Sequence, residues 1–299
     1  MRRTLFAVAT TVALLLAGCG GSEEPETPTD PTAEAGFPVT VGDLTLESRP
    51  TRIVSLSPTV TEMLFAIGAG EQVVAVDELS NYPPEAPVTE LSGFEINVEA
   101  VAEYDPDLVI ISSYPEVIEQ FEPLGIPVHL APDNPTTIED VYTQITDLGA
   151  LTGRPDEAAD LVTRMRDDLA KLVADVPDRE QPLRYYIEID DTYWTYTSDS
   201  LIGSLFAMVG LANIAGEQGA VSVQLTAEEI IDSNPDVIFL MNAAFGMTPE
   251  QVAARAGWAD IEAVRNDRIV ALDTDVASRW GPRLVDLMAT VVDTVSQIP

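Results

Sequence analysis

The sequence predicts an α/β protein made of two lobes joined by a single long helix. Short apolar, β-branched runs alternate with helical stretches in both halves, which is typical of parallel sheets covered by helices. Between the halves, residues 155–176 carry apolar side chains at helical spacing, and roughly 20 residues at 1.5 Å each make a rod of about 30 Å. A similar segment also occurs once in each half, as INVEAVAEYDPDLVII at residues 96–111 and as LTAEEIIDSNPDVIFL at residues 225–240.

The N-terminal lobe is assigned to residues 38–153. Ser57-Pro58 suits the start of a helix, because proline fits the first helical position, and Thr59 with Glu62 offers a capping box as an alternative start. Gly68 suits the end of that helix. Four short apolar runs predict strands, and one further stretch predicts a helix: strands at 52–56, 72–77, 107–111 and 128–130, and a helix near 116–121.

The linking helix is assigned to residues 154–177 and the C-terminal lobe to residues 178–299. The alternation of strands and helices resumes in this lobe: strands at 184–189, 236–241 and 268–272, and helices near 200–209 and from about Pro282. Because the repeated segment occurs once in each lobe, we expect the two lobes to be pseudo-symmetric.

The N-terminus predicts export and anchoring. An apolar run from Leu5 to Leu16 follows two arginines and is too short for an ordinary membrane-spanning helix, so residues 1–18 are interpreted as a signal peptide. Leu-Ala-Gly-Cys, ending at Cys19, resembles the lipobox of bacterial lipoproteins, which implies a diacylated Cys19 as the mature N-terminus. Residues 19–37 hold three prolines and no base before the first folded stretch, which predicts a solvated tether.

Charge and cysteine content exclude several classes. Removing residues 1–18 takes away two of 15 bases and none of 50 acids, so the mature charge is 13 − 50 = −37. Such a surface repels nucleic acid and anionic lipid, and we therefore expect neither as a partner. Cys19 is the only cysteine of the chain, which excludes a disulfide framework within one molecule.

The repeated segment places one glutamate at the start of a short helix in each lobe. Asn97 and Thr226 are suitable N-caps, so Glu99 and Glu228 fall in the first helical turn. A carboxylate there interacts favourably with the helix dipole by about 0.3–1 kcal/mol, which accounts for each glutamate singly. A matched pair, one in each lobe, can in addition meet two bases on a symmetric partner and fix its register.

Several motifs together resemble one known family. These are R-I-V-S-L-S-P-T-V-T-E, N-Y-P-P-E-A, D-P-D-L-V-I and the late D-x-x-x-R-x-x-P-R, spread over residues 50–299. They resemble the substrate-binding lipoproteins of ABC importers for vitamin B12, ferric siderophores and haem, and the cobalamin-binding members most of all. The resemblance implies two Rossmann-like lobes joined by a single backbone helix and a ligand cleft between them. It also implies that Glu99 and Glu228 dock onto arginines of a dimeric permease, which works with an ATPase.

The resemblance further implies which residues bind the ligand. By position, Asp275 and Arg279 match an acid–base pair that reaches the ligand, and Tyr196 matches an aromatic of the cleft. Three tryptophan positions of the cobalamin-binding members do not match here, at or near Gly93, Ser112 and Ser222.

Other candidates each have two interpretations. Phe94, Tyr114 and Trp194 lie near the unmatched positions and are expected to substitute for them in part. Trp194 and Tyr196 either contact the ligand or pack as aromatics of a polar loop at the end of a strand. Tyr82 either contacts the ligand or packs the loop at Pro83-Pro84. Arg279 contacts the ligand or pairs within the protein with Asp275 or another acid. Trp280 and Arg283 are assigned to the start and packing of the final helix.

Arg279 is the only base at a matched cleft position, so we expect a neutral or weakly charged ligand, because a buried anion requires paired bases. Cobalamin or another corrinoid fits, with a ferric hydroxamate siderophore as the alternative. Haem is less favoured, since it usually has an axial His or Tyr; the one histidine, His129, and several tyrosines stay open for that role.

The remaining expectations concern class and location. The chain has no Gly-x-Ser-x-Gly elbow and no histidine cluster, so we expect neither an enzyme nor a metal site, and no cofactor. We expect a monomer outside the cytoplasm, anchored to the cell membrane through Cys19. A surface or sensor lipoprotein without a transport role is the alternative of another class.

Overall fold

The computed structural model describes residues 36–299. The predicted signal peptide, Cys19 and nearly all of the predicted tether lie outside the described residues. Within residues 36–299, no helix combines the length and the apolar character needed to cross a membrane.

Four parallel strands form the sheet of the N-terminal lobe, and all four were predicted. Their order is β4 (Val73–Val76), β3 (Ile53–Leu56), β5 (Leu108–Ile111) and β6 (Val128–Leu130). Every residue of β3 and β5 is buried, as expected for central parallel strands covered on both faces. The covering helices are α1 (Pro58–Ala66), α2 (Val98–Ala102), α3 (Ile118–Phe121) and α4 (Ile138–Leu151).

The start of α1 decides between the two predicted caps. Ser57 has extended backbone angles and its hydroxyl accepts a hydrogen bond from the amide of Val60, while Pro58 occupies the first helical turn. Glu62 is therefore not part of a capping box; its side chain is buried instead.

The sheet of the C-terminal lobe has the same topology. Its order is β9 (Leu211–Asn213), β7 (Leu183–Glu188), β11 (Val237–Leu240) and β12 (Ile269–Ala271), all parallel. In both lobes the second strand lies at one edge, followed by the first, third and fourth. The repeated segment supplies the helix before the third strand in each lobe, α2 before β5 and α7 (Ala227–Ser233) before β11. The predicted pseudo-symmetry is confirmed.

Further elements complete each lobe. They are the hairpin β1 (Val39–Val41) with β2 (Leu44–Leu46), the hairpin β8 (Trp194–Tyr196) with β10 (Ser222–Gln224), and the helices α6 (Leu201–Met208), α8 (Pro249–Ala253), α9 (Glu262–Arg265), α10 (Thr274–Ser278) and α11 (Leu284–Ser296). Both hairpins, β9 and the helices α4, α8, α9 and α10 were not predicted from the sequence. The hairpin strands and β9 span only three residues each, too few for a clear alternation of apolar and polar residues.

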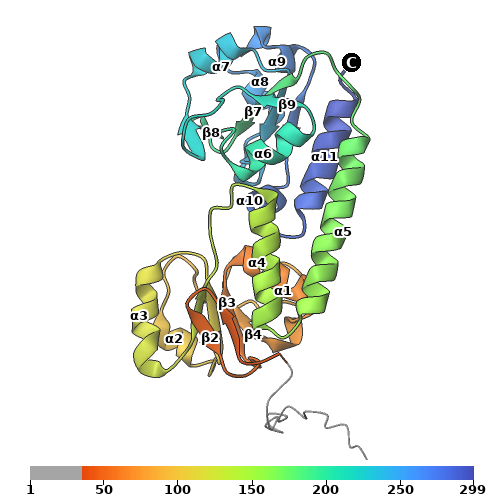
Figure 1. The fold of residues 1–299 in the computed structure, drawn as a ribbon. Coiled ribbons are helices and arrows are strands. Elements are labelled where there is room, and N and C mark those ends of the chain that lie inside the picture. The colour runs from red at the N-terminus through yellow and green to blue at the C-terminus, as the bar shows by residue number, and fades with distance from the viewer. Residues whose placement is uncertain (1–35) are drawn as a thin grey trace, which may run out of the picture. The chain divides into compact units, whose positions relative to one another are not determined.

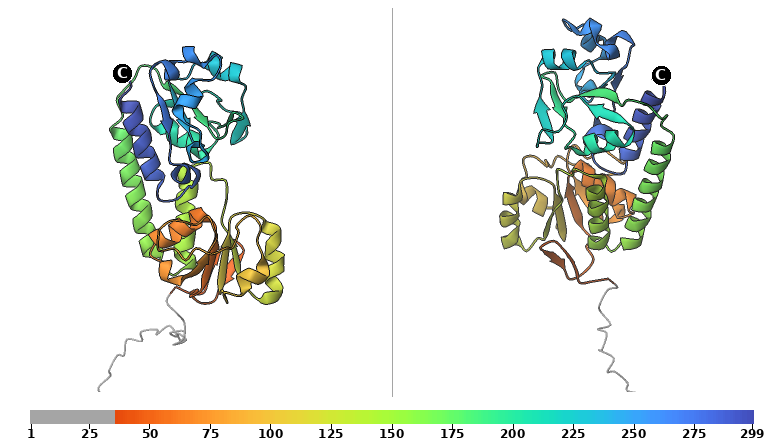
Figure 2. Two further views of the ribbon diagram at one scale, coloured as in Figure 1. Left: turned by 180° about the vertical axis from the view of Figure 1, so that it is seen from behind. Right: turned by 45° about the horizontal axis from the view of Figure 1, so that its top comes forward.

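The predicted linking helix is present as α5 (Pro155–Ala174). Figures 1 and 2 show it alongside α4 and α11, which both contact it. Its buried residues, Ala158, Leu161, Met165 and Leu169, form the stripe that the sequence predicted.

One apolar core runs from the first lobe through these helices into the second. Members of this single cluster are Met63 of α1, Ile145 of α4, Leu169 of α5, Phe206 of α6 and Val291 of α11, each at most 2% exposed. Close-packed interiors resist deformation, so a hinge motion would have to disturb this core. The two lobes are therefore expected to move little relative to each other.

His129 gives a pH test of the N-terminal sheet. It lies on β6, and burial lowers its pKa from 6.5 to about 4. On acidification, His129 of the unfolded chain therefore binds a proton near pH 6.5, whereas His129 of the folded chain binds one only near pH 4. Stability is fully present above pH 6.5 and falls as pH drops toward 4, by about 3 kcal/mol at 1.36 kcal/mol per pKa unit. Because the chain has one histidine, its ring-proton NMR signal in untagged protein reports the pKa directly. A midpoint near 6.5 in the folded protein would contradict the burial.

Candidate functional site

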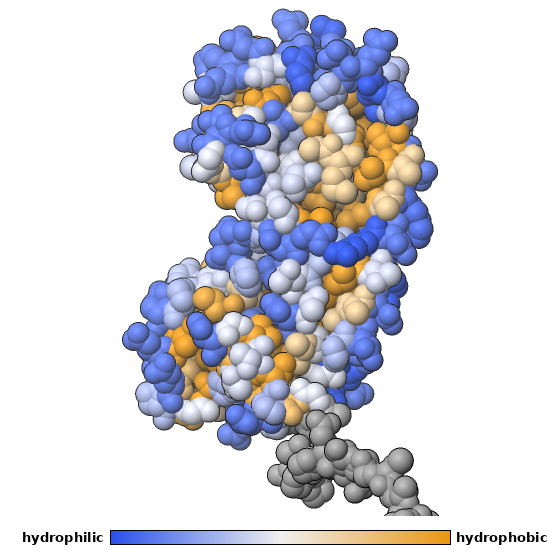
Figure 3. Space-filling view, viewed as in Figure 1, coloured by the Kyte–Doolittle hydropathy of each residue, from blue (hydrophilic) through white to orange (hydrophobic). Residues whose placement is uncertain are grey.

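A cavity of about 470 Å³ lies between the lobes; we call it the main cavity. It is lined by residues that follow the carboxyl ends of parallel strands in both sheets: Ser57 after β3, Asp77 and Leu79 after β4, Ser112 after β5, Asp133 after β6, Phe245 after β11 and Asp275 after β12. Ligands of open α/β sheets bind at these ends, because the loops there are free to vary over a fixed scaffold. Figure 3 shows the surface notched between the lobes, on the side away from α5.

Large apolar side chains remain exposed at the main cavity. Phe94 from the N-terminal lobe is 63% exposed, Phe245 from the C-terminal lobe is 84% exposed, and Leu79 is 47% exposed. The half-buried Trp280 also lines the cavity, and its indole nitrogen donates to Gln144 Oε1 at 3.2 Å, which fixes the ring. Aromatic rings left open at a cavity are suited to cover the apolar faces of a large ligand.

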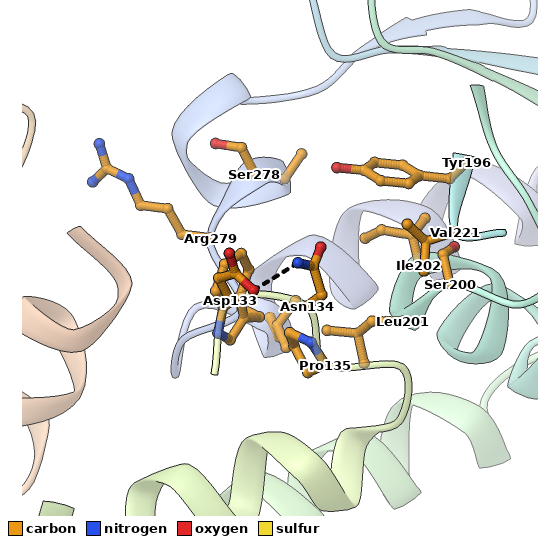
Figure 4. A pocket seen from close by; sticks show the side chains of 13 residues that line it. Asp133, Asn134, Pro135, Tyr196, Ser200, Leu201, Ile202, Val221, Ser278 and Arg279 are labelled. Carbon is orange, nitrogen blue, oxygen red and sulfur yellow. Dashed lines mark hydrogen bonds between the residues drawn. The ribbon is translucent and has the colours of Figure 1, made fainter. Parts of the chain in front are cut away.

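A smaller cavity of about 70 Å³ adjoins the main one; we call it the side cavity. Tyr196 of β8 and Ile202 of α6 line it from the C-terminal lobe (Figure 4). Five residues line both cavities: Asp133, Asn134, Ser278, Arg279 and Trp280. The side cavity thus shares a wall with the main cavity.

The predicted ligand residues divide into two groups. Phe94, Asp275 and Arg279 line the main cavity, and Tyr196 and Arg279 line the side cavity. Gly93 and Ser112, at two of the unmatched tryptophan positions, also line the main cavity, so small residues widen it there.

Three predicted residues line neither cavity. The Tyr82 ring lies under the guanidinium of Arg283 at 4.3 Å, which agrees with a packing role. Tyr114 precedes the short helical turn at Pro115, and Trp194 lies opposite Gln224 in the β8–β10 hairpin. His129 lies inside the sheet and lines neither cavity, which removes it as an axial ligand for a haem held there.

Trp280 and Phe245 were missed as cavity residues. Trp280 immediately follows Arg279 in a motif already assigned to the cleft, and this adjacency was an available signal. Phe245 comes shortly after β11, where a loop at the carboxyl end of a parallel strand faces the ligand side of the sheet.

Arg279 is held within the protein and does not offer a free charge to the cavity. It is 7% exposed and donates to Glu62 Oε1 at 3.1 Å, Asn81 Oδ1 at 2.8 Å and the Leu79 carbonyl at 3.0 Å. It also pairs with Asp275 at 3.1 Å. The geometry therefore favours the second of the two interpretations of Arg279, pairing within the protein.

Glu62 joins the two lobes through a buried ion cluster. The carboxylate, 3% exposed on α1, accepts from Arg279 and, at 2.8 Å, from Nε of Arg283 just before α11. Asn81 adds a second link between the lobes by donating to Asp275 Oδ2 at 2.9 Å. Asp77 lies beside this cluster; burial raises its pKa, and hydrogen bonds from Leu79 and Ser80 partly oppose the rise.

Removal of the Glu62 charge is expected to lower the free energy of unfolding more than removal of an exposed charge at Glu157. Glu62→Gln leaves the largely buried Arg283 without its counter-ion and the buried Arg279 with Asp275 alone, and we expect the free energy of unfolding to fall by about 3–5 kcal/mol. Glu157→Gln removes an exposed pair with Arg154 and is expected to cost about 1 kcal/mol or less. Urea unfolding of both variants measures the difference, and equal losses would contradict the role of Glu62.

The two repeated glutamates are both free at the surface. Asn97 caps α2 by accepting from the amide of Ala100 at 3.1 Å, and Thr226 caps α7 in a capping box with Glu229. The capping box uses the carboxylate of Glu229, and the neighbouring Glu228 takes no part in it. Glu99 and Glu228 are exposed, and neither carboxylate has a hydrogen-bond or ion-pair partner within residues 36–299.

Residues 53–276 match the family described as "Periplasmic binding protein". The chain belongs to this family. An ABC transporter substrate-binding lipoprotein of Bacillus subtilis, named YvrC and described as uncharacterized, is 30% identical over 98% of this chain and 97% of its own length. A cobalamin-binding protein of Halobacterium salinarum is 30% identical over 98% of this chain and 85% of its own length.

The fold of this chain is also similar to that of a solved structure. The periplasmic vitamin B12-binding protein BtuF of Vibrio cholerae superposes with a TM-score of 0.66 at 25% identity, covering 83% of this chain and 98% of its own. The two-lobed α/β fold predicted from the sequence is confirmed, and so is the resemblance to the binding proteins of these importers.

Proposed function

We propose that this periplasmic binding protein delivers cobalamin or a related corrinoid to an ABC importer, and that a lipid on Cys19 anchors it outside the cytoplasm. The main cavity carries the proposal: its walls are rich in open aromatic side chains and its lining base is already paired. The names of the relatives in Halobacterium salinarum and Vibrio cholerae support the same ligand class.

The charged residues that line the main cavity favour a ligand with few or no negative groups. The acids Asp77, Asp133 and Asp275 line the main cavity, and Arg279 is the base among its lining residues. An anionic ligand would therefore lose its water without gaining a free counter-charge. Corrinoids carry neutral amide arms around an apolar-faced ring, and both features suit this lining.

Calorimetric titration of the purified protein with cyanocobalamin tests the proposal, and we expect micromolar or tighter binding. A neutral ferric hydroxamate complex is titrated in parallel, because it also needs no counter-charge. Binding of the ferric complex without binding of cyanocobalamin would move the function to siderophore delivery.

Phe245→Ala is expected to weaken cyanocobalamin binding by at least about two- to tenfold, since one aromatic contact contributes about 0.5–1.5 kcal/mol beyond area burial. The matched control is Leu124→Ala, which removes another exposed apolar side chain that lines neither cavity. Calorimetry measures both affinities. An unchanged affinity in Phe245→Ala would show that the ligand does not reach the rim of the cavity.

The exposed glutamates of the repeat are proposed to dock onto the permease dimer. The double variant Glu99→Ala/Glu228→Ala is expected to keep its ligand affinity but to lose stimulation of the importer ATPase in proteoliposomes. Glu119→Ala/Glu217→Ala is the control, because it removes the same charge from one exposed site in each lobe.

The two double variants also separate the alternatives. Loss of ligand binding with intact stimulation would overturn the docking assignment of Glu99 and Glu228. Absence of stimulation by the unaltered protein, with ligand bound, would favour the sensor or surface lipoprotein.

A further inference from the structure

We infer that the side cavity is a subsite that receives a propionamide arm of the ligand and rejects the same arm when it ends in a carboxylate. This inference rests on the proposed function and names the chemical feature by which the site would select one corrinoid from another.

The side cavity has the size of a short ring substituent. Its volume of about 70 Å³ exceeds what one water needs and falls well below the ~150 Å³ of a cavity that holds benzene. It shares five lining residues with the main cavity, among them Asp133 and Trp280, so the two cavities are neighbours. A flat ring in the main cavity could therefore extend one arm of a few non-hydrogen atoms into it.

The polar groups of the side cavity match both ends of a primary amide. Asp133 accepts from Asn134 Nδ2 at 2.6 Å and from the Ser113 hydroxyl at 3.4 Å, and its second lone pairs remain available to an amide N–H. On the opposite wall, the Tyr196 hydroxyl points toward Ser278 (Figure 4). Burial raises the pKa of Tyr196, so its phenol keeps its proton and can donate to the amide carbonyl.

The side cavity lacks what a carboxylate arm would need. Arg279 is the base among its lining residues, and Figure 4 shows its guanidinium pointing away from Asn134 and Tyr196. That guanidinium is bound to Glu62 and Asn81 instead. A carboxylate arm would therefore lie near Asp133 without a free positive group among the described lining residues, whereas an amide arm would be satisfied.

The test compares cyanocobalamin with its three isomeric monocarboxylic acids, each with one propionamide hydrolysed. We expect calorimetry to find one isomer bound about tenfold or more weakly than cyanocobalamin, and the other two bound within about threefold of it. The acidic protein surface would weaken all three acids alike, so selectivity among the isomers distinguishes the subsite from general repulsion.

Asp133→Asn removes the carboxylate charge from the lining of the side cavity. We expect the weakly bound acid isomer then to bind within about threefold of cyanocobalamin. Asp160→Asn, on the exposed face of α5, removes the same charge elsewhere and should leave the discrimination unchanged. Asp133 is itself exposed, so its variant should fold, which thermal unfolding checks.

Three results would overturn the inference. Equal affinities for the three acids, or undiminished discrimination in Asp133→Asn, would remove the subsite and leave the proposed function standing. No binding of any corrinoid by the folded protein would overturn the proposed function and the subsite together.

Discussion

The contact of Glu62 with Arg279 and Arg283 holds the rest of the site in place. One carboxylate of the N-terminal lobe meets two guanidinium groups of the C-terminal lobe, and all three side chains are largely buried. Once such charges have left water, separating them is costly, because each would be left uncompensated in a poorly polarisable interior. The apolar core along α4, α5 and α11 restrains the same lobes behind the cavity. Together they favour a cavity that exists before the ligand arrives.

The same contact also determines the chemistry of the cavity. Arg279 lines both cavities, yet its two terminal nitrogens donate to Glu62, Asn81 and Leu79. The cavity walls therefore combine open aromatic rings with acids and uncharged polar groups. A ligand that suits them has apolar faces and neutral hydrogen-bonding arms, and this description connects the proposed corrinoid with the amide-selective subsite.

The sequence predicted the parts of the fold that depend on local pattern. The four strands of the first sheet, helix α5 and the repeated helix-strand unit each have a signal within a few residues of themselves. Helix α4 also had one, since Thr137 and Asp140 form a capping box, and it was overlooked. The pairing of Glu62 with Arg279 joins residues 217 apart in the chain, and no local pattern reveals it. Trp280 and Phe245 did have local signals, since Trp280 adjoins Arg279 and Phe245 follows β11 closely, but which loops meet across the cavity depends on how the two lobes pack.

A crystal structure of the protein with cyanocobalamin would show whether a cavity fixed by the Glu62 cluster binds a corrinoid. We expect the corrin ring in the main cavity against Phe94 and Phe245, with the contacts of Glu62 to Arg279 and Arg283 retained. A ligand bound elsewhere, or lobes rotated apart with those contacts broken, would contradict it.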